Sequence, residues 1–271
     1  AFLSKERIRK NFLNCCLEKY NNLDAQNIKD NYFSKNFANT YFDSINSRKI
    51  GFIREDIERL YKENKLNTRE RAYLITSLIY GLDRIANTVG HYDAYRKVDI
   101  PKKDLMLKPL NIKRDRKKAN IYKMDANELA LSLVADVVYI DPPYNSRQYC
   151  DSYHLLENIA NWKKEKVYGI AKKNDRSDIK SDYNLKSAGI VFGDLITKLK
   201  AKYILVSYND MGTSGDSRSH SRISDHEILS ALESRGDVKV YEKDFSQFTT
   251  GKSTKENLKE RIFFCKVREI E

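Results

Sequence analysis

The chain has 271 residues, of which 41% are hydrophobic, with 18 tyrosines and 11 phenylalanines, so it can bury the core of one large domain or two small ones. No run of 18 apolar residues and no signal-peptide pattern is present, and no membrane span is therefore expected. The formal net charge of +12 is compatible with a merely soluble surface, but it also favours a polyanionic partner, because clustered lysines and arginines release phosphate counterions.

The amino-terminal half is predicted to be helical and basic. Residues 1–66 are polar and helix-like, and Asn67 with Glu70 three residues later resembles a capping box that begins the next helix. Apolar residues then recur at helical spacing, and Gly90 is predicted to end that helix. Residues 96–118 carry ten Lys or Arg against three Asp and are predicted to form a loop, either a solvated connector or a nucleic-acid contact.

From residue 120 the pattern changes to alternating strands and helices. Strands are predicted at 120–124, 137–140 and 203–208, with a short helix at 126–134 and a longer helical region near 183–200. Ser224 and Glu227 form a capping box for a helix that Gly236 is predicted to stop. Residues 238–245 and 260–267 are predicted to be two final strands, able to form an antiparallel hairpin. The alternation predicts an α/β sheet.

The four cysteines are Cys15, Cys16, Cys150 and Cys265, and no C-x-x-C pair occurs among them. A zinc site or a disulfide framework is therefore not expected, no metal site is predicted, and a reducing cytoplasm fits this cysteine usage.

The stretch VVYIDPPYNSRQYC, residues 137–150, carries the chemistry. A short β-branched and aromatic run is typical of a buried strand, and Asp141 ends it. Pro142 and Pro143 have no N–H for a β-ladder, so a stiff turn must follow at the carboxyl end of the strand, where open α/β sheets bind ligands. The Asp141 carboxylate and the Pro142 carbonyl offer two acceptors, and Tyr144 offers a flat ring. Together they suit a planar group that bears an NH₂, such as adenine.

With its flanks this stretch resembles the amino-group DNA methyltransferases that use S-adenosylmethionine, in the adenine-specific subgroup whose target-recognition region precedes the catalytic motif. The resemblance rests on YIDPPYNSRQYCDSYHLLENIA, LDRIANTVGHYDAYRK and VSYND before a capped helix, and it covers the chain from about residue 40 to its end. Some members of this type recognise CATG. The resemblance implies a cytoplasmic restriction-modification enzyme that acts on double-stranded DNA and protects it from a cognate restriction endonuclease.

The same resemblance assigns roles to individual residues. Asp141 and the Pro142 carbonyl, with Pro143 in the motif, would bind the target amino group, and Tyr144 would stack on an adenine flipped out of the duplex. Asp125, with Ala126 beside it, would contact the adenine of the cofactor, and Asp141 would also face its methionine end. A plain helix N-cap is the alternative role for Asp125. Weaker candidates for DNA contacts are Asn145, Arg147 and Tyr149, whose alternative role is loop packing. Arg218 and Arg222 lie in a Gly- and Ser-rich stretch that is either a mobile phosphate-contacting loop or simply a disordered one.

One departure concerns the cofactor loop. The family has a Lys- and Gly-containing motif and a Phe-x-Gly-x-Gly loop near its amino end, followed by an acidic residue for the cofactor's hydroxyls, and none of these occurs here. We therefore expect the chain to lack several dozen upstream residues, including the central strand of the sheet. A divergent cofactor loop is the less favoured alternative, because close backbone approach to the cofactor favours glycine.

Two expectations follow from that departure. The 271 residues alone should bind S-adenosylmethionine weakly or not at all, and the sheet edge left exposed should make the chain unstable or prone to pair with other chains.

The expected fold is a Rossmann-like methyltransferase sheet with a mostly helical target-recognition insertion. Residues 1–24 would begin the catalytic domain, residues 25–118 would form the helical target-recognition region, and residues 119–271 would complete the catalytic domain. Two alternatives remain open at this point: an RNA methyltransferase on the same scaffold, and a DNA-binding fragment without catalysis.

Overall fold

The computed structural model describes residues 7–100, 103–112, 119–143, 147–210, 223–245 and 258–268. The chain divides into two compact units: Ala1–Ile121 with Tyr149–Ile179, here called the helical unit, and Tyr122–Gln148 with Lys180–Glu271, here called the sheet unit. Within the described ranges, no helix is long and apolar enough to cross a bilayer.

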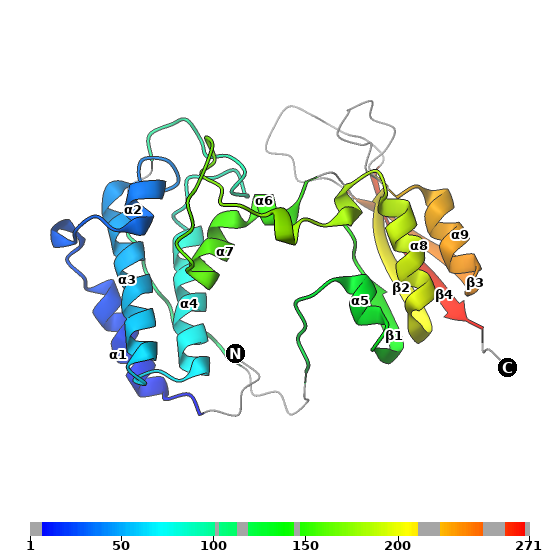
Figure 1. The fold of residues 1–271 in the computed structure, drawn as a ribbon, viewed down its shortest axis with the longest axis horizontal. Coiled ribbons are helices and arrows are strands. Elements are labelled where there is room, and N and C mark those ends of the chain that lie inside the picture. The colour runs from blue at the N-terminus through cyan, green and yellow to red at the C-terminus, as the bar shows by residue number, and fades with distance from the viewer. Residues whose placement is uncertain are drawn as a thin grey trace. The chain divides into compact units, whose positions relative to one another are not determined.

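The helical unit contains α1 (Lys10–Asn21), η1 (Ala25–Asn27), α2 (Tyr32–Phe37), α3 (Ser44–Lys62), α4 (Thr68–Asp83), α6 (Tyr149–Ser152), α7 (His154–Asn161) and η2 (Ser177–Ile179) (Figure 1). The sheet unit contains α5 (Ala126–Ala130), β1 (Val134–Ile140), η3 (Asp182–Asn184), α8 (Ala188–Lys198), β2 (Lys200–Asp210), α9 (Asp225–Glu233), β3 (Gly236–Phe245) and β4 (Leu258–Val267).

The predicted capping box at the start of α4 is confirmed. The Asn67 side chain accepts a hydrogen bond from the Glu70 backbone N–H at 2.9 Å, and the Glu70 carboxylate accepts one from the Asn67 N–H at 3.2 Å. The prediction that Gly90 ends this helix is wrong, because α4 ends at Asp83. The buried Asn87 amide donates to the carbonyls of Thr40 and Arg96 and so holds the chain in a loop before Gly90 is reached.

The described part of the predicted loop, residues 96–100 and 103–112, is irregular, but it is not a solvated connector. Leu105 and Leu107 are buried in the core of the helical unit. Asn46 on α3 donates to the Lys103 carbonyl and accepts from the Leu105 N–H. Asn21 is the last residue of α1, and its side-chain amide likewise donates to the Leu107 carbonyl and accepts from the Leu107 N–H. The segment is therefore fastened to two helices by side-chain amides.

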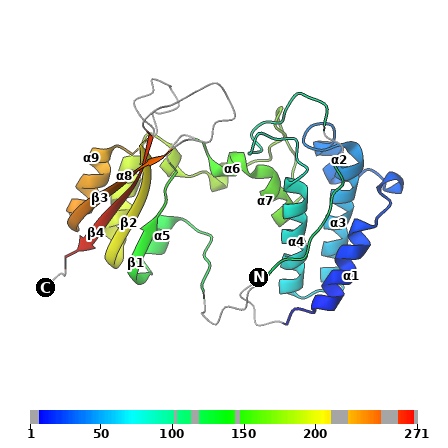
Figure 2. The same cartoon turned by 180° about the vertical axis from the view of Figure 1, so that it is seen from behind.

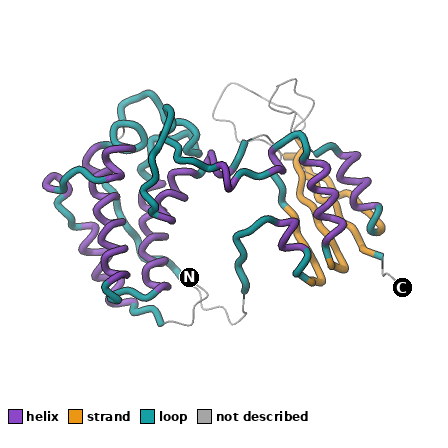
Figure 3. The backbone as a smooth tube through the Cα atoms, in the orientation of Figure 1, coloured by secondary structure: helices purple, strands orange, loops and turns teal. Residues whose placement is uncertain are grey.

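The strands of the sheet unit are drawn in orange in Figure 3. Among the described residues they form a mixed four-stranded sheet in the order β1-β2-β4-β3 (Figure 1). β1 pairs with β2 in parallel, whereas β4 is antiparallel to both β2 and β3. This confirms the predicted strand at 203–208 and the predicted pair of closing strands, and the mixed α/β architecture agrees with the expected class of fold. The capping box of Ser224 and Glu227 at the start of α9 is also confirmed.

Helices α8 and α9 lie on one face of this sheet (Figures 1 and 2). On that face Ile204 and Val206 of β2 are buried with Phe263 of β4. On the other face Val137 and Tyr139 of β1 are 55% and 59% exposed. The prediction of a strand at 137–140 is thus confirmed, but the prediction that it is buried is wrong. β1 is an edge strand among the described residues, and only one of its faces packs against helices.

Three further predictions need correction. Residues 120–124 form no strand, because a strand exists only when a neighbour pairs with it, and none of the described residues does so. The helix predicted at 126–134 is shorter, since the chain enters β1 at Val134. Gly236 does not stop α9, which ends at Glu233. It is the first residue of β3 instead, where it pairs with Val267.

Candidate active site at the carboxyl end of β1

Asp141 directly follows the last residue of β1. Its side chain is exposed, while Pro142 is buried and Pro143 is half-buried. The last pair of the parallel ladder is Ile140 with Val206, so the ladder stops where the prolines begin, as their missing N–H groups require. The acidic residue of the motif therefore lies at the carboxyl edge of a parallel strand pair, where ligands bind in open α/β sheets.

The neighbouring strand β2 brings two further polar residues to this edge. Ser207 follows Val206, so continuation of the register places it opposite Asp141. Asn209 lies two residues further along the same face of β2, and its Oδ1 atom is buried with no hydrogen-bond partner within the described part of the chain. Sequence reasoning did not select either residue, although both belong to the VSYND stretch. An unsatisfied buried acceptor is rare and calls for a physical explanation.

The chain that follows the motif is anchored within the sheet unit. Gln148 is buried, donates to the Ser181 carbonyl at 2.8 Å and accepts from the Ser181 N–H at 2.8 Å. Asn184 donates to the Arg147 carbonyl at 2.9 Å. The backbone of Arg147 is thus held at η3, while its side chain is exposed. Sequence reasoning missed Gln148, because its role depends on a segment more than thirty residues away.

Asp125 is the N-cap of α5. One carboxylate oxygen, Oδ1, accepts from the Asn127 N–H at 2.8 Å and from the Glu128 N–H at 3.1 Å. The capping role considered as an alternative is therefore real. It does not exclude a ligand contact, because both bonds use the same oxygen. Asp125 and Ala126 are exposed. The burial of Tyr183, together with the nearby carboxylates of Asp125 and Asp194, raises the pKa of the Tyr183 hydroxyl, which donates to the side chain of Asn127.

In the helical unit, Tyr149 begins α6 and is exposed, as a nucleic-acid contact requires. Its ring stacks on that of Tyr153, with centroids 6.1 Å apart and an interplanar angle of 21°. Tyr153 is also exposed, and it was not selected from the sequence. Its four-residue spacing from Tyr149 was the available signal, since residues at i and i+4 on a helix are neighbours.

The remaining predicted residues lie outside the described part of the chain. These are Tyr144, Asn145, Arg218 and Arg222.

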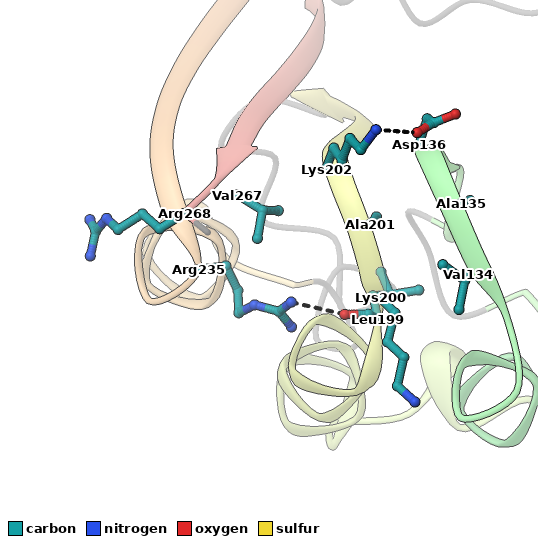
Figure 4. Close-up of a pocket in the computed structure, with 10 residues that line it drawn as sticks. All are labelled: Val134, Ala135, Asp136, Leu199, Lys200, Ala201, Lys202, Arg235, Val267 and Arg268. Carbon is teal, nitrogen blue, oxygen red and sulfur yellow. Dashed lines mark hydrogen bonds and ion pairs between the residues drawn. The ribbon is translucent and has the colours of Figure 1, made fainter. Parts of the chain in front are cut away.

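A pocket occurs at the opposite end of β1 and β2 (Figure 4). It is lined by Val134, Ala135, Asp136, Leu199, Lys200, Ala201, Lys202, Arg235, Val267 and Arg268. Lys202 pairs with Asp136 at 2.8 Å, and Arg235 donates to the carbonyl of Leu199 at the end of α8. Two of its cationic side chains therefore have structural partners, and the pocket lies at the far end of β1 from Asp141.

Known proteins similar to this chain share one activity in their names. A family model described as D12 class N6 adenine-specific DNA methyltransferase matches residues 6–212. The modification methylase StsI of Streptococcus sanguinis is 38% identical over 198 residues, which are 70% of this chain and 30% of that protein. The type II methyltransferase M.FokI of Planomicrobium okeanokoites is 34% identical over 231 residues, which are 83% of this chain and 34% of that protein.

A third relative is the type II methyltransferase M.NlaIII of Neisseria lactamica, which is 35% identical over 176 residues, or 64% of this chain and 52% of that protein. No solved structure matches the chain. The chain spans about a third of the length of the first two relatives, whereas the family model covers most of the chain itself. The chain therefore belongs to the D12 class of N6 adenine-specific DNA methyltransferases.

Proposed function

We propose that this protein transfers a methyl group from S-adenosylmethionine to the exocyclic amino group of adenine in a specific duplex DNA site, and so protects that site from a cognate restriction endonuclease. The observation that carries the proposal is the exposed Asp141 and its two prolines at the carboxyl end of β1, in a chain of this family. A stiff turn holds the carboxylate where a ligand can reach it.

The chain's own residues act on the target nitrogen. The amino group of adenine is a poor nucleophile, because its lone pair is delocalised into the ring. The Asp141 carboxylate and the Pro142 carbonyl accept hydrogen bonds from its two hydrogens and favour a more tetrahedral nitrogen, whose lone pair can point at an electrophile. This is positioning and electrostatic preorganisation, without a covalent enzyme intermediate. Tyr144 stacks on the flipped base.

The polar residues Asp125, Asp141 and Asn209 fit the cofactor chemically. S-adenosylmethionine supplies a methyl group on a positively charged sulfonium, and it carries an ammonium, two hydroxyls and an adenine amino group as donors. Asp141 provides negative charge and Asp125 provides an acceptor beside its capping bonds. Asn209 provides a buried oxygen that has no other partner among the described residues. We propose that these three acceptors, with Ala126 beside Asp125, hold the cofactor.

The DNA contacts that we propose come from both units. In the sheet unit they are Arg147 with Asn145, and Arg218 and Arg222 further along the chain. In the helical unit the stacked pair of Tyr149 and Tyr153 offers flat exposed rings of the kind on which bases stack. Residues 25–118 remain the proposed target-recognition region, and Rossmann-like topology remains the proposed form of the catalytic sheet.

We also propose that the complete cofactor pocket includes a glycine-containing segment beside β1. β1 has a neighbour on one side only within the described chain, and its outward face carries exposed Val137 and Tyr139. A further strand beside β1 would place a backbone next to Asp141, where glycine allows close approach to a ligand.

Identification of the product tests this function. The polypeptide that the complete reading frame encodes is incubated with radiolabelled S-adenosylmethionine and, side by side, with mixed-sequence duplex DNA and with RNA. Nucleosides are then separated after digestion. The expected product is labelled N6-methyladenine in DNA. Label in RNA alone would establish the RNA methyltransferase instead, and a protein that binds DNA without cofactor binding by calorimetry would be the non-catalytic fragment.

A further inference from the structure

Residues 163–173, with the sequence KKEKVYGIAKK, form a hairpin on the helical unit that the proposed function leaves without a role. Tyr168 and Lys173 exchange two backbone hydrogen bonds, of 2.8 and 3.0 Å, and Gly169 to Lys172 form the turn between them. The segment carries five lysines and one glutamate. It is here called the basic hairpin.

Buried groups hold the base of the basic hairpin rigidly. The hydroxyl of the fully buried Tyr41 shares its one proton between the carbonyl of Tyr92 at 2.6 Å and that of Ala171 at 3.0 Å. The Tyr32 hydroxyl donates to the Glu165 carbonyl at 2.7 Å. Lys173 forms ion pairs with Asp93 and Asp151, and this second carboxylate lies on α6, between Tyr149 and Tyr153. The base is therefore fixed to the core and to the helix that carries the stacked tyrosines.

The tip of the basic hairpin is built differently. Ile170 is 77% exposed and Tyr168 is 58% exposed. The Lys166 ammonium lies 5.3 Å from the centre of the Tyr168 ring. Lys172 has a left-handed φ of 54°, a conformation that costs a non-glycine residue about 1–2 kcal/mol. Strained backbone conformations of this kind cluster at functional sites.

We propose that the basic hairpin is a duplex-DNA contact, in which Lys166 and Lys172 neutralise phosphates while Ile170 enters a groove as an apolar wedge. This inference rests on the proposed function. Ammonium groups that flank an apolar tip match the charged backbone of DNA and the apolar faces of its bases, and architectural proteins insert such wedges between base steps. Rigidity favours the contact, because little conformational freedom is lost when it forms.

The other two lysines at the start of the hairpin are less suited to phosphate. Lys164 forms an ion pair with Glu55, and Lys163 lies 3.8 Å from a carboxylate oxygen of Glu165. The test therefore concentrates on Lys166, Lys172 and Ile170.

Binding of a fluorescently labelled mixed-sequence duplex is measured at a series of KCl concentrations, with the polypeptide that the complete reading frame encodes. The double variant Lys166→Gln/Lys172→Gln should lower the slope of log affinity against log salt by about 2, since each phosphate contact contributes about 0.9. Ile170→Ala should weaken binding several-fold with the slope unchanged, because an apolar contact releases no counterion.

Matched controls come from the sheet unit. Ile190 on α8 is 78% exposed, and Lys186 and Lys200 are exposed lysines of the same unit. Ile190→Ala and the double variant Lys186→Gln/Lys200→Gln therefore remove the same groups elsewhere. Thermal melting verifies that every variant folds. Hairpin variants that bind and respond to salt as these controls do would overturn the inference alone. A wild-type protein that binds no duplex at all would overturn the proposed function as well.

Discussion

His154, the first residue of α7, is a buried titratable group whose surroundings keep it neutral. Its Nε2 lies 2.8 Å from the Tyr92 carbonyl oxygen, which can only accept, so Nε2 carries the proton. Its Nδ1 is buried and has no hydrogen-bond partner among the described residues. Burial lowers the pKa of His154 to about 4, helped by the positive charges of Lys173 and Arg176.

Acid should therefore destabilise the fold through this histidine. The unfolded chain binds the proton near pH 6.5, whereas the folded chain resists it until about pH 4, so stability falls as the pH drops through that interval. The full loss is about 3 kcal/mol. Urea unfolding of wild type and His154→Gln between pH 7 and 5 should show a flatter pH dependence in the variant, because a glutamine can still donate to Tyr92.

His226 on α9 is exposed and supplies the control. His226→Gln should keep the wild-type pH dependence. An equal slope in the wild type and in His154→Gln would show that His154 titrates normally in the folded protein.

Among the elements of the sheet, β3 depends on a residue without a side chain. A Cβ atom at Gly236 would lie 1.9 Å from the carbonyl oxygen of Lys266 on the paired strand β4, and backbone cannot move aside cheaply. We predict that Gly236→Ala destabilises the protein by about 1–3 kcal/mol, the usual cost of forced overpacking. Thermal or urea unfolding measures the change.

At a second glycine, substitution by alanine is predicted to change the stability in the opposite direction. Gly193 lies inside α8, and no heavy atom of the described residues lies within 4 Å of a Cβ built there. Gly193→Ala should stabilise the protein by about 0.5–1 kcal/mol, because alanine has the better helix propensity. If both substitutions had the same effect, the close approach of β3 and β4 at Gly236 would be refuted.

Local signals in the sequence predicted much of this fold. Asn67 and Ser224 mark their helices because a capping box needs only four consecutive residues, and both boxes are present. Pairing partners are not local, and this is why residues 120–124 were wrongly predicted as a strand. The burial of Val137 and Tyr139 was wrong for the same reason, since burial depends on what covers that face of the sheet.

For the candidate site, the motif was visible in the sequence but its supports were not. Asp141 and the prolines follow from residue types alone. Gln148 became apparent only through Ser181, and Tyr153 only through its stacking on Tyr149. Residues 149–179 likewise belong to the helical unit because of contacts with elements distant in sequence, such as those between α7 and α4. Sequence patterns therefore indicate which residues can carry chemistry, but not which distant segments hold them in place.

At the scale of the whole molecule, the completeness of the cofactor pocket determines whether residues 1–271 bind S-adenosylmethionine on their own. Asp125, Asp141 and Asn209 supply acceptors, and we propose that a glycine-containing segment supplies the rest. A ligand held by only some of its contacts still loses its translational freedom, so affinity should fall steeply. Calorimetry of residues 1–271 should show weak or no binding of S-adenosylmethionine, and addition of the glycine-loop segment of a relative should restore it. Micromolar binding by residues 1–271 alone would refute this proposal.

The proposed function depends most on Asp141 at the end of β1, whose carboxylate binds the target amino group during methyl transfer. It is tested most directly by the rate of N6-methyladenine formation in duplex DNA by wild type, Asp141→Ala and Asp136→Ala, in the polypeptide that the complete reading frame encodes. Asp136 lies in the same strand, is exposed, and belongs to the opposite end of β1. We predict that Asp141→Ala lowers turnover by about two to three orders of magnitude with DNA affinity nearly unchanged, while Asp136→Ala behaves as wild type. Near-normal turnover in Asp141→Ala would contradict this role of Asp141.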